Sequence, residues 1–387
     1  METSNLTPLS TSGRIHSIDI LRGLIMVLMA IDHVRVYSGI PAWGTTADIF
    51  FTRWITHFCA PGFAFFAGCS AFLYLKKTRS KSALQKFLMT RGILLVLLEL
   101  TLIRFAWTFN LNYGSFTLAG VIWMLGWCMV LLSFFVGLKP STVAIIGFII
   151  MAGQQVFHYV PNLFPASVRD NVSTIWNFFY PTATEPHGPI TILYVLLPWL
   201  GVMMCGYGFG LILLKQPTER KKICLWIGLS AIAIFLVAAS IAANGEDKDK
   251  SVPFIFRLLN QNKYPPSQLY LLMTLGPLIT LVPIVESVKS GLSKIFALFG
   301  SVPMFYYIMH IFVIHISALA VNYFRLGNIH GEWYDHAPYA EVPEQSRWML
   351  STLYLVFLCD VIILYPICKF YSKYKKSHPK MAWLRYL

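Results

Sequence analysis

Long apolar segments follow one another along the whole chain and are separated by shorter polar ones. There are ten of them, at residues 18–38, 49–75, 88–109, 118–138, 141–160, 190–214, 223–243, 268–288, 301–324 and 347–370. Each holds about twenty residues, which is enough for an α-helix to cross about 30 Å of hydrocarbon. The pattern therefore predicts an all-α polytopic membrane protein with about ten transmembrane helices, forming a single domain over residues 1–387.

Basic residues gather in alternate connections between these segments. Six Lys or Arg residues lie in 76–91, four in 215–222 and six in 369–387, whereas the connections on the other side mix acids and bases. Because cytoplasmic loops carry an excess of Lys and Arg, the pattern predicts that both termini are cytoplasmic. The net charge of +14 then reflects orientation in the membrane, and we expect no nucleic-acid partner.

The composition favours the same class of protein. Hydrophobic residues make up 56% of the chain and charged residues only 12%, about half the charged fraction of a soluble domain. The seven cysteines lie within or at the ends of the predicted helices and form no CxxC pair. Neither a disulfide framework nor a metal site is therefore expected.

The first predicted helix carries ionisable residues that lipid does not tolerate. Such side chains usually face a packed interior or a water-filled cavity, and they mark function. On a helix, Arg22 and His33 fall within about 20° of each other, with Asp19 about 40° and Asp32 about 80° away. We therefore expect a polar stripe that runs from the cytoplasmic end of this helix to its outer half.

Other intramembrane residues allow more than one interpretation. His57, in the second predicted helix, lies near the depth of His33, so the two histidines are expected to line one cavity; a structural ring bonded to a nearby carbonyl is the alternative. Glu99 and Arg104 are five residues apart and do not face each other, so a structural ion pair with an outside partner competes with a catalytic role.

A second pair of histidines lies in the ninth predicted helix. His310 and His315 point about 140° apart and do not face one pocket together. We favour His310, which is nearer the middle of the helix.

Several motifs resemble one known family. The stretch RIHSIDILRG fits the pattern R-x-x-S-x-D-x-x-R-G, and IDHVRVY, APGFAFFAG and GSVPMFYYIMH follow at later helices. Together with the predicted topology, they resemble the heparan-α-glucosaminide N-acetyltransferase catalytic-domain family of transmembrane acyltransferases, in a bacterial branch.

The resemblance implies transfer of an acetyl group from cytoplasmic acetyl-CoA to a sugar or glycan acceptor on the opposite side of the membrane. We expect this membrane to be the bacterial inner membrane, because the sequence shows no large lumenal N-terminal domain and no organelle signal. Arginine pairs with phosphate through two parallel hydrogen bonds, which suits contacts to coenzyme A. The residues expected to bind this donor are Arg14, Asp19, Arg22, Arg91 and His310.

The chain departs from the better-known branch of that family at its catalytic position. That branch has Asn where His33 stands, an acid where His57 stands, and a catalytic His before a small-residue–Trp pair; here that stretch reads GIPAWGTT. We therefore expect His33 or His57 to act as general base or nucleophile, with Asp32 orienting one ring. Histidine suits this role because its unperturbed pKa is about 6.5.

Two other function classes are compatible with the pattern. A proton-coupled transporter or flippase of an envelope lipid or glycan intermediate also uses intramembrane His and Asp residues. A structural membrane subunit explains the topology but not the polar stripe. We favour the acyltransferase, with acyl-CoA, a glycan acceptor and membrane lipid as partners and a homodimer as an option.

Overall fold

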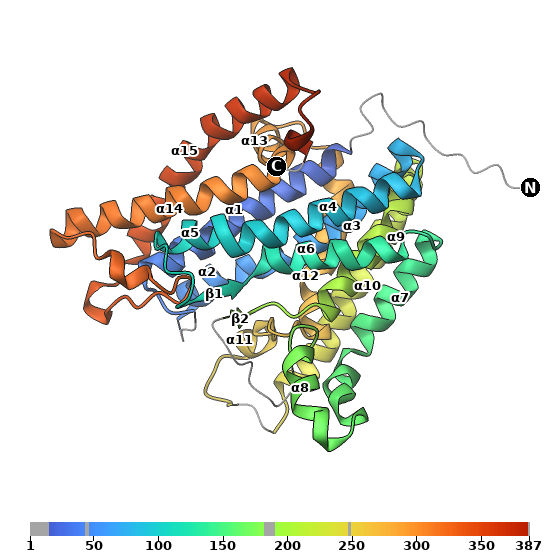
Figure 1. Cartoon of the computed structure of the whole chain (residues 1–387), viewed down its shortest axis with the longest axis horizontal. Helices are drawn as coiled ribbons and strands as arrows, with labels where there is room; N and C mark the ends of the chain where they lie inside the picture. Colours follow the sequence, from blue (N-terminus) through green and yellow to red (C-terminus); the bar gives the residue numbers. More distant parts are fainter. Residues whose placement is uncertain (1–14, 43–45, 182–189, 247–248, 386–387) are drawn as a thin grey trace, which may run out of the picture.

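The computed structural model describes residues 15–42, 46–181, 190–246 and 249–385, which are helical almost throughout (Figure 1). Arg14, expected above to bind the donor, lies outside the described residues.

Fifteen α-helices are assigned within the described residues: α1 (His16–Ser38), α2 (Ala47–Trp54), α3 (Cys59–Thr78), α4 (Lys81–Leu98), α5 (Arg104–Thr108), α6 (Val121–Phe135), α7 (Pro140–Ala152), α8 (Ala166–Trp176), α9 (Leu197–Leu213), α10 (Pro217–Ala243), α11 (Phe254–Leu259), α12 (Gln268–Glu286), α13 (Gly291–Ser301), α14 (Pro303–Leu326) and α15 (Leu350–Ser377). Tighter or wider helical turns add η1 (Ile55–Phe58), η2 (Glu99–Ile103), η3 (Gln154–Leu163), η4 (Gly331–Tyr334), η5 (Glu344–Ser346) and η6 (Ala382–Arg385). Strand structure in this part of the chain is confined to β1 (Thr117–Ala119) and β2 (Ile190–Ile192), which pair in parallel.

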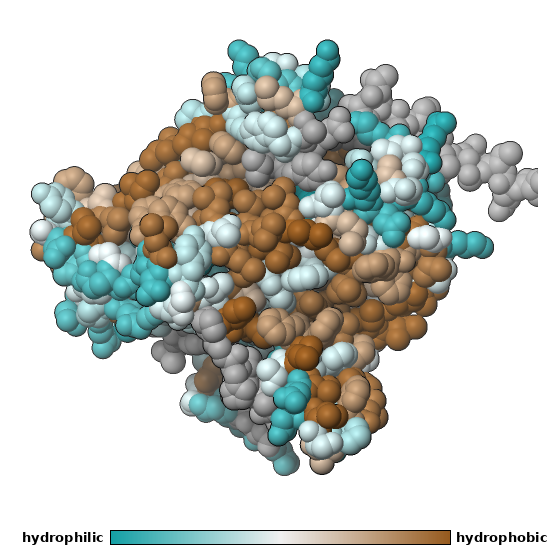
Figure 2. Space-filling view, in the orientation of Figure 1, coloured by the Kyte–Doolittle hydropathy of each residue, from teal (hydrophilic) through white to brown (hydrophobic). Residues whose placement is uncertain are grey.

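Several of these helices are long and apolar enough to cross a membrane. Five stretches of the described residues qualify: Ala47–Thr78, α10, α12, α14 and α15. The bent pair of α7 and η3 makes a sixth, with 77° between its halves. Figure 2 shows a broad apolar belt across the molecule, with hydrophilic side chains gathered beyond it. The protein is therefore a multi-pass helical membrane protein, while the count of ten spans stays a prediction.

Each of the ten predicted segments contains a helix, but the structure differs from the prediction at several ends. The segment 190–214 begins as strand β2, and its helix starts only at Leu197. The segment 141–160 bends after Gly153, and the segment 88–109 widens into a π-helix at η2. Helices α8 and α11 lie outside the predicted segments, and α13 lies almost entirely outside them. Hydrophobic runs indicate which segments are apolar enough to form membrane helices, but they do not indicate where the backbone of such a helix bends.

Helix α1 lies at the centre of the bundle, where it packs against α3, α12, α13, α14 and α15. Its backbone touches that of α13, because a Cβ atom at Gly23 would collide with the carbonyl of Phe296, and one at Gly300 with the carbonyl of Asp19. Small residues allow such close approach between membrane helices. The polar stripe on α1 is therefore enclosed by protein instead of facing lipid.

Polar contacts tie the helix ends together at each end of the bundle. At one end, Glu286 of α12 accepts hydrogen bonds from Arg220 of α10 (2.8 Å) and from Ser17 of α1 (3.3 Å). At the opposite end, the backbone N–H of Trp348 donates to the carbonyl of Ser38 at 3.0 Å, so the segment before α15 packs over the end of α1. This arrangement agrees with alternating helix directions. Which end faces the cytoplasm remains a prediction from the loop charges.

Candidate active site

Two cavities lie along α1, and we name each by its polar lining. The basic cavity, of about 310 Å³, is lined by Arg22, Arg91 and Lys375 among apolar side chains. The histidine cavity, of about 290 Å³, is lined by His33 and His57 together with five charged residues: Asp32, Arg35, Arg53, Glu99 and Lys263.

The basic cavity takes its cations from three helices. Arg22 projects from α1 and donates a hydrogen bond to the carbonyl of Phe66 at 2.7 Å and another to the Ser70 hydroxyl on α3. Arg91 comes from α4, and Lys375 from the last turn of α15. Guanidinium and ammonium groups are the usual protein partners of phosphate. The remaining wall is mostly apolar, so the cavity suits a ligand with a phosphate end and an uncharged arm.

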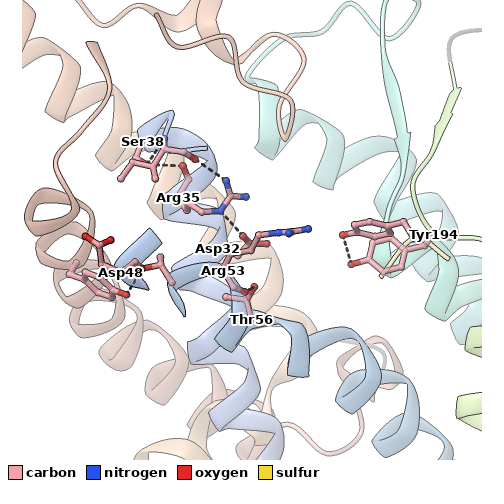
Figure 3. Close-up of polar contacts among 11 residues, drawn as sticks. Asp32, Arg35, Ser38, Asp48, Arg53, Thr56 and Tyr194 are labelled. Carbon is pink, nitrogen blue, oxygen red and sulfur yellow. Dashed lines mark hydrogen bonds and ion pairs between the residues drawn. The ribbon is translucent and has the colours of Figure 1, made fainter. Parts of the chain in front are cut away.

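Asp32 and two arginines form one wall of the histidine cavity. Arg35 donates from Nε to Asp32 at 2.9 Å and from Nη1 to the carbonyl of Ile40 at 2.9 Å, which fixes both side chains. Figure 3 shows Arg53 beside this pair, and Tyr194 across from them. The carboxylate of Asp32 is thereby held at the edge of the cavity.

His33 lines the same cavity from α1, and its ring is fixed by contacts with two neighbouring side chains. Its Nδ1 atom lies 2.6 Å from Nε2 of His310 on α14, and its ring meets the edge of Trp107 with centroids 4.7 Å apart. His310 is wholly buried. The ring of His33 is thus anchored at Nδ1 while another part of it lines the cavity.

His57 stands in η1, the tight turn between α2 and α3. Pro61 lacks the N–H that a helix would supply to the carbonyl of His57 four residues earlier, and the Tyr270 hydroxyl donates to that carbonyl instead, at 2.7 Å. The His57 ring is buried, and its Nδ1 atom has no hydrogen-bond partner within the described residues. The His57 residue lines the cavity, while its Nδ1 atom is shielded by the surrounding protein.

Lys263 contributes a cation from the loop between α11 and α12. Its ammonium lies 5.1 Å from the ring centre of Tyr264 and 5.8 Å from that of Tyr194. Burial alone would lower the pKa of Lys263, but Tyr264 and Asp32 outweigh burial and raise that pKa above its ordinary value. Lys263 therefore remains positively charged at neutral pH.

The contacts of Glu99 and Arg104 bear on the choice between a structural ion pair and a catalytic role for these residues. Glu99 sits at the start of the π-helix η2 and accepts a hydrogen bond from the backbone N–H of Ile122 at 3.2 Å, at the start of α6. Arg104 donates instead to the carbonyls of Phe116 (3.1 Å) and Asn112 (2.6 Å). Glu99 thus accepts one of the otherwise unsatisfied backbone N–H groups at the N-terminus of α6 and also lines the histidine cavity. Arg104 instead bonds to carbonyls of the loop after α5.

The structure separates the predicted site residues into three groups. His33, His57 and Asp32 line the histidine cavity, and Arg22 and Arg91 line the basic cavity.

Two predicted donor contacts lie elsewhere. Asp19 is buried at the start of α1, and His310 is buried behind His33, so neither belongs to the lining of these two cavities. Helical periodicity places Asp19 on the same side of α1 as Arg22, but α13 covers α1 at that position.

Lining residues that sequence reasoning missed include Lys263, Tyr307 and Lys375. The sequence marks Lys375 only as one of the basic residues that set the orientation in the membrane. It marks Lys263 only as a residue of a connection that mixes acids and bases. Tyr307 carried no signal beyond its apolar surroundings. These three residues belong to elements that are distant from α1 in the sequence and lie beside it only because the helices pack together.

The two cavities adjoin. Phe63 of α3 and Tyr307 of α14 line both of them, so these two side chains form the boundary between the cations and the histidines. Along α1, the basic cavity with Arg22 is followed by the histidine cavity with His33.

Comparison with protein families finds one match. The family described as "Heparan-alpha-glucosaminide N-acetyltransferase, catalytic" matches residues 14–243, which is more than half of the chain. The matched part includes α1, α3 and both histidines of the cavity wall, whereas Lys263, Tyr307, His310 and Lys375 lie beyond it. No curated protein matches the chain.

Proposed function

Because this chain belongs to the heparan-alpha-glucosaminide N-acetyltransferase catalytic-domain family, we propose that it transfers an acetyl group from cytoplasmic acetyl-CoA to a sugar or glycan acceptor on the opposite side of the inner membrane. The observation that carries the proposal is the pair of adjoining cavities along α1, one lined by cations and the other by histidines.

The basic cavity is the proposed donor site. Arg22, Arg91 and Lys375 bind the phosphates of coenzyme A, and Arg14 joins them as a prediction from sequence. The apolar wall, which includes Ala67 and Ala71, accommodates the pantetheine arm. Arg22 and His33 are eleven residues apart on α1, about 16 Å at about 1.5 Å per residue, so an extended arm is needed to bring the acyl carbonyl to the histidine.

The histidine cavity is the proposed reaction site. His33 accepts the proton of the acceptor amine or hydroxyl while that atom bonds to the acyl carbon and the thioester C–S bond breaks. The proton then passes from His33 to the departing sulfur, which leaves as the thiol of coenzyme A. A positioned general base of this kind contributes about 10²–10⁴-fold to the rate.

His57 and Asp32 have supporting roles in this proposal. The His57 ring, which lines the cavity, orients the acceptor by a hydrogen bond. Asp32, fixed by Arg35, provides negative charge next to His33 when that ring is protonated. An acyl-His33 intermediate is the two-step variant of the same chemistry.

The test is acetyl transfer by the purified full-length protein in nanodiscs, with acetyl-CoA as donor and glucosamine as acceptor. We expect release of free coenzyme A that depends on acceptor, and a loss of about 10²–10⁴-fold in kcat/KM for His33→Ala. His158→Ala is the matched control, because His158 lies in η3, is exposed, and contacts the carbonyl of Pro181 instead of either cavity.

Two results would overturn the proposal. One is near-normal activity in His33→Ala, which lacks the proposed base. The other is pH-dependent movement of a glycan substrate into liposomes with no release of coenzyme A, which would favour the transporter.

A further inference from the structure

Three groups on α1 and α14 form a continuous hydrogen-bonded row. Nδ1 of His33 lies 2.6 Å from Nε2 of His310, and Nδ1 of His310 lies 3.1 Å from the backbone carbonyl of Tyr306. The two imidazole rings are nearly parallel, at 23°. Packing fixes this row, because Tyr306 stacks against His310, Tyr307 meets the same ring edge to face, and Trp107 packs against His33.

The row determines where the protons lie. A carbonyl oxygen only accepts hydrogen bonds, so Nδ1 of His310 carries a proton and donates it to Tyr306. His310 is 0% exposed and forms no ion pair with a carboxylate of the described residues. Placing a charge on so deeply buried a ring is costly, so His310 is neutral and its Nε2 is an acceptor.

The same reasoning then fixes His33. Since Nε2 of His310 accepts, Nδ1 of His33 carries the proton that joins the two rings. Which nitrogen of an imidazole is protonated is set by the hydrogen bond that the other makes. A neutral His33 in this tautomer has its lone pair on Nε2, and no hydrogen bond from a described residue occupies that atom.

We propose that His310 is a positioning residue that holds His33 in the Nδ1–H tautomer, so that the Nε2 lone pair serves as the base in the histidine cavity. This inference rests on the proposed function for its chemical consequence, but the tautomer itself does not depend on activity. The family match ends before α14, so the role is assigned from the geometry alone.

The hydrogen bond between His33 and His310 also stabilises His33 during the proton transfer. When Nε2 of His33 takes the acceptor's proton, the ring becomes an imidazolium that still donates from Nδ1 to His310. A hydrogen bond from a charged donor is roughly twice as strong as one between neutral groups. Other ionisable groups on the walls around His33 include Asp32 and Arg35 from α1, Arg53 from α2, Glu99 from η2 and Lys263 from the loop before α12. His310 therefore stabilises the protonated state without touching the substrate.

The experiment is nitrogen-15 NMR of the full-length protein in nanodiscs, labelled at histidine, with His33 assigned from the difference spectrum of His33→Gln. We expect Nδ1 of His33 to be protonated and Nε2 to be unprotonated. A protonated Nε2 with a bare Nδ1 would overturn the inference even if the enzyme is active. Conversely, the expected tautomer in a protein without acetyl transfer would leave the inference standing and contradict the proposed function.

Kinetics of two variants test the consequence. His310→Phe removes the acceptor, and we expect kcat to fall about 10–100-fold, less than the about 10²–10⁴-fold that the general base itself contributes, with unchanged binding of acetyl-CoA. His310→Gln keeps an acceptor oxygen and is expected to recover most of kcat.

The matched control is His315→Gln, which changes an equally buried histidine of the same helix whose Nδ1 faces the carbonyl of Ala106. It should leave kcat unchanged. Equal losses in His310→Gln, His310→Phe and His315→Gln would show that His310 has only a structural role.

Discussion

At the scale of single residues, the site depends on polar side chains whose partners come from distant parts of the chain. His33 is hydrogen-bonded to His310, 277 positions away in the chain, and Arg22 is hydrogen-bonded to the backbone carbonyl of Phe66, 44 positions away. Helical periodicity placed Arg22 and His33 on one stripe, which agrees with their positions on two adjoining cavities. It gave no means of identifying Lys263, Tyr307 or Lys375 as neighbours.

Arg91 provides a residue-scale test of the donor site. Arg91→Gln should raise the KM for acetyl-CoA about tenfold, which corresponds to about 1.4 kcal/mol, because a charged hydrogen-bonding group next to phosphate is lost. The KM for acetyl-pantetheine, which lacks the nucleotide phosphates, should not change. Steady-state kinetics with both donors measures the difference.

Lys86→Gln is the control for this experiment, because Lys86 is an exposed cation on the same helix and does not line the cavity. If Arg91→Gln and Lys86→Gln behave alike, or if both donors are affected equally, the basic cavity does not bind the phosphates.

At the scale of elements, breaks in regular helix position the site. The turn η1 carries His57, the π-helix η2 carries Glu99, and Pro61 leaves a carbonyl for Tyr270 to satisfy. The apolar segments that contain these breaks were predicted, since long hydrophobic runs are a strong signal. Pro61 predicts a loosened backbone at its own position, but the sequence does not predict the tight turn η1 or the π-helix η2, because local backbone geometry depends on tertiary partners such as Tyr270.

Tyr270→Phe tests the support of η1. The substitution leaves the buried carbonyl of His57 without its donor, and an unsatisfied buried polar group costs about 1–3 kcal/mol. We expect a lower melting temperature in nanodiscs and a higher KM for the acceptor, with little change in the KM for acetyl-CoA.

Tyr207→Phe is the same substitution at another wholly buried tyrosine, whose hydroxyl has no hydrogen-bond partner among the described residues. It should not lower the melting temperature. Equal destabilisation by the two variants would argue against a specific role for the bond to His57.

At the scale of the whole molecule, α1 is surrounded by other helices and the two cavities follow it through the bundle. The sequence predicted the helical membrane class and the central importance of the first helix. It did not predict that α13 and α14 would close around that helix, because close backbone contacts such as Gly23 with Phe296 involve residues that are far apart in the chain.

Filling the basic cavity tests whether it is the donor path. Ala67→Trp places an indole where the pantetheine arm is proposed to lie, and we expect acetyl-CoA affinity to fall at least about tenfold, or about 1.4 kcal/mol, by isothermal titration. Ala233→Trp on the exposed face of α10 is the control and should bind normally. Normal binding by Ala67→Trp would exclude this cavity as the donor site.

The central claim, that an acetyl group crosses the membrane between the two cavities, is tested most directly in sealed proteoliposomes. Acetyl-CoA is supplied only on the side of the basic cavity and glucosamine only on the other side, and the compartment of each product is determined. The account predicts coenzyme A on the donor side and acetylated glucosamine on the acceptor side, both abolished in His33→Ala. Product formation only when donor and acceptor share one compartment would contradict it.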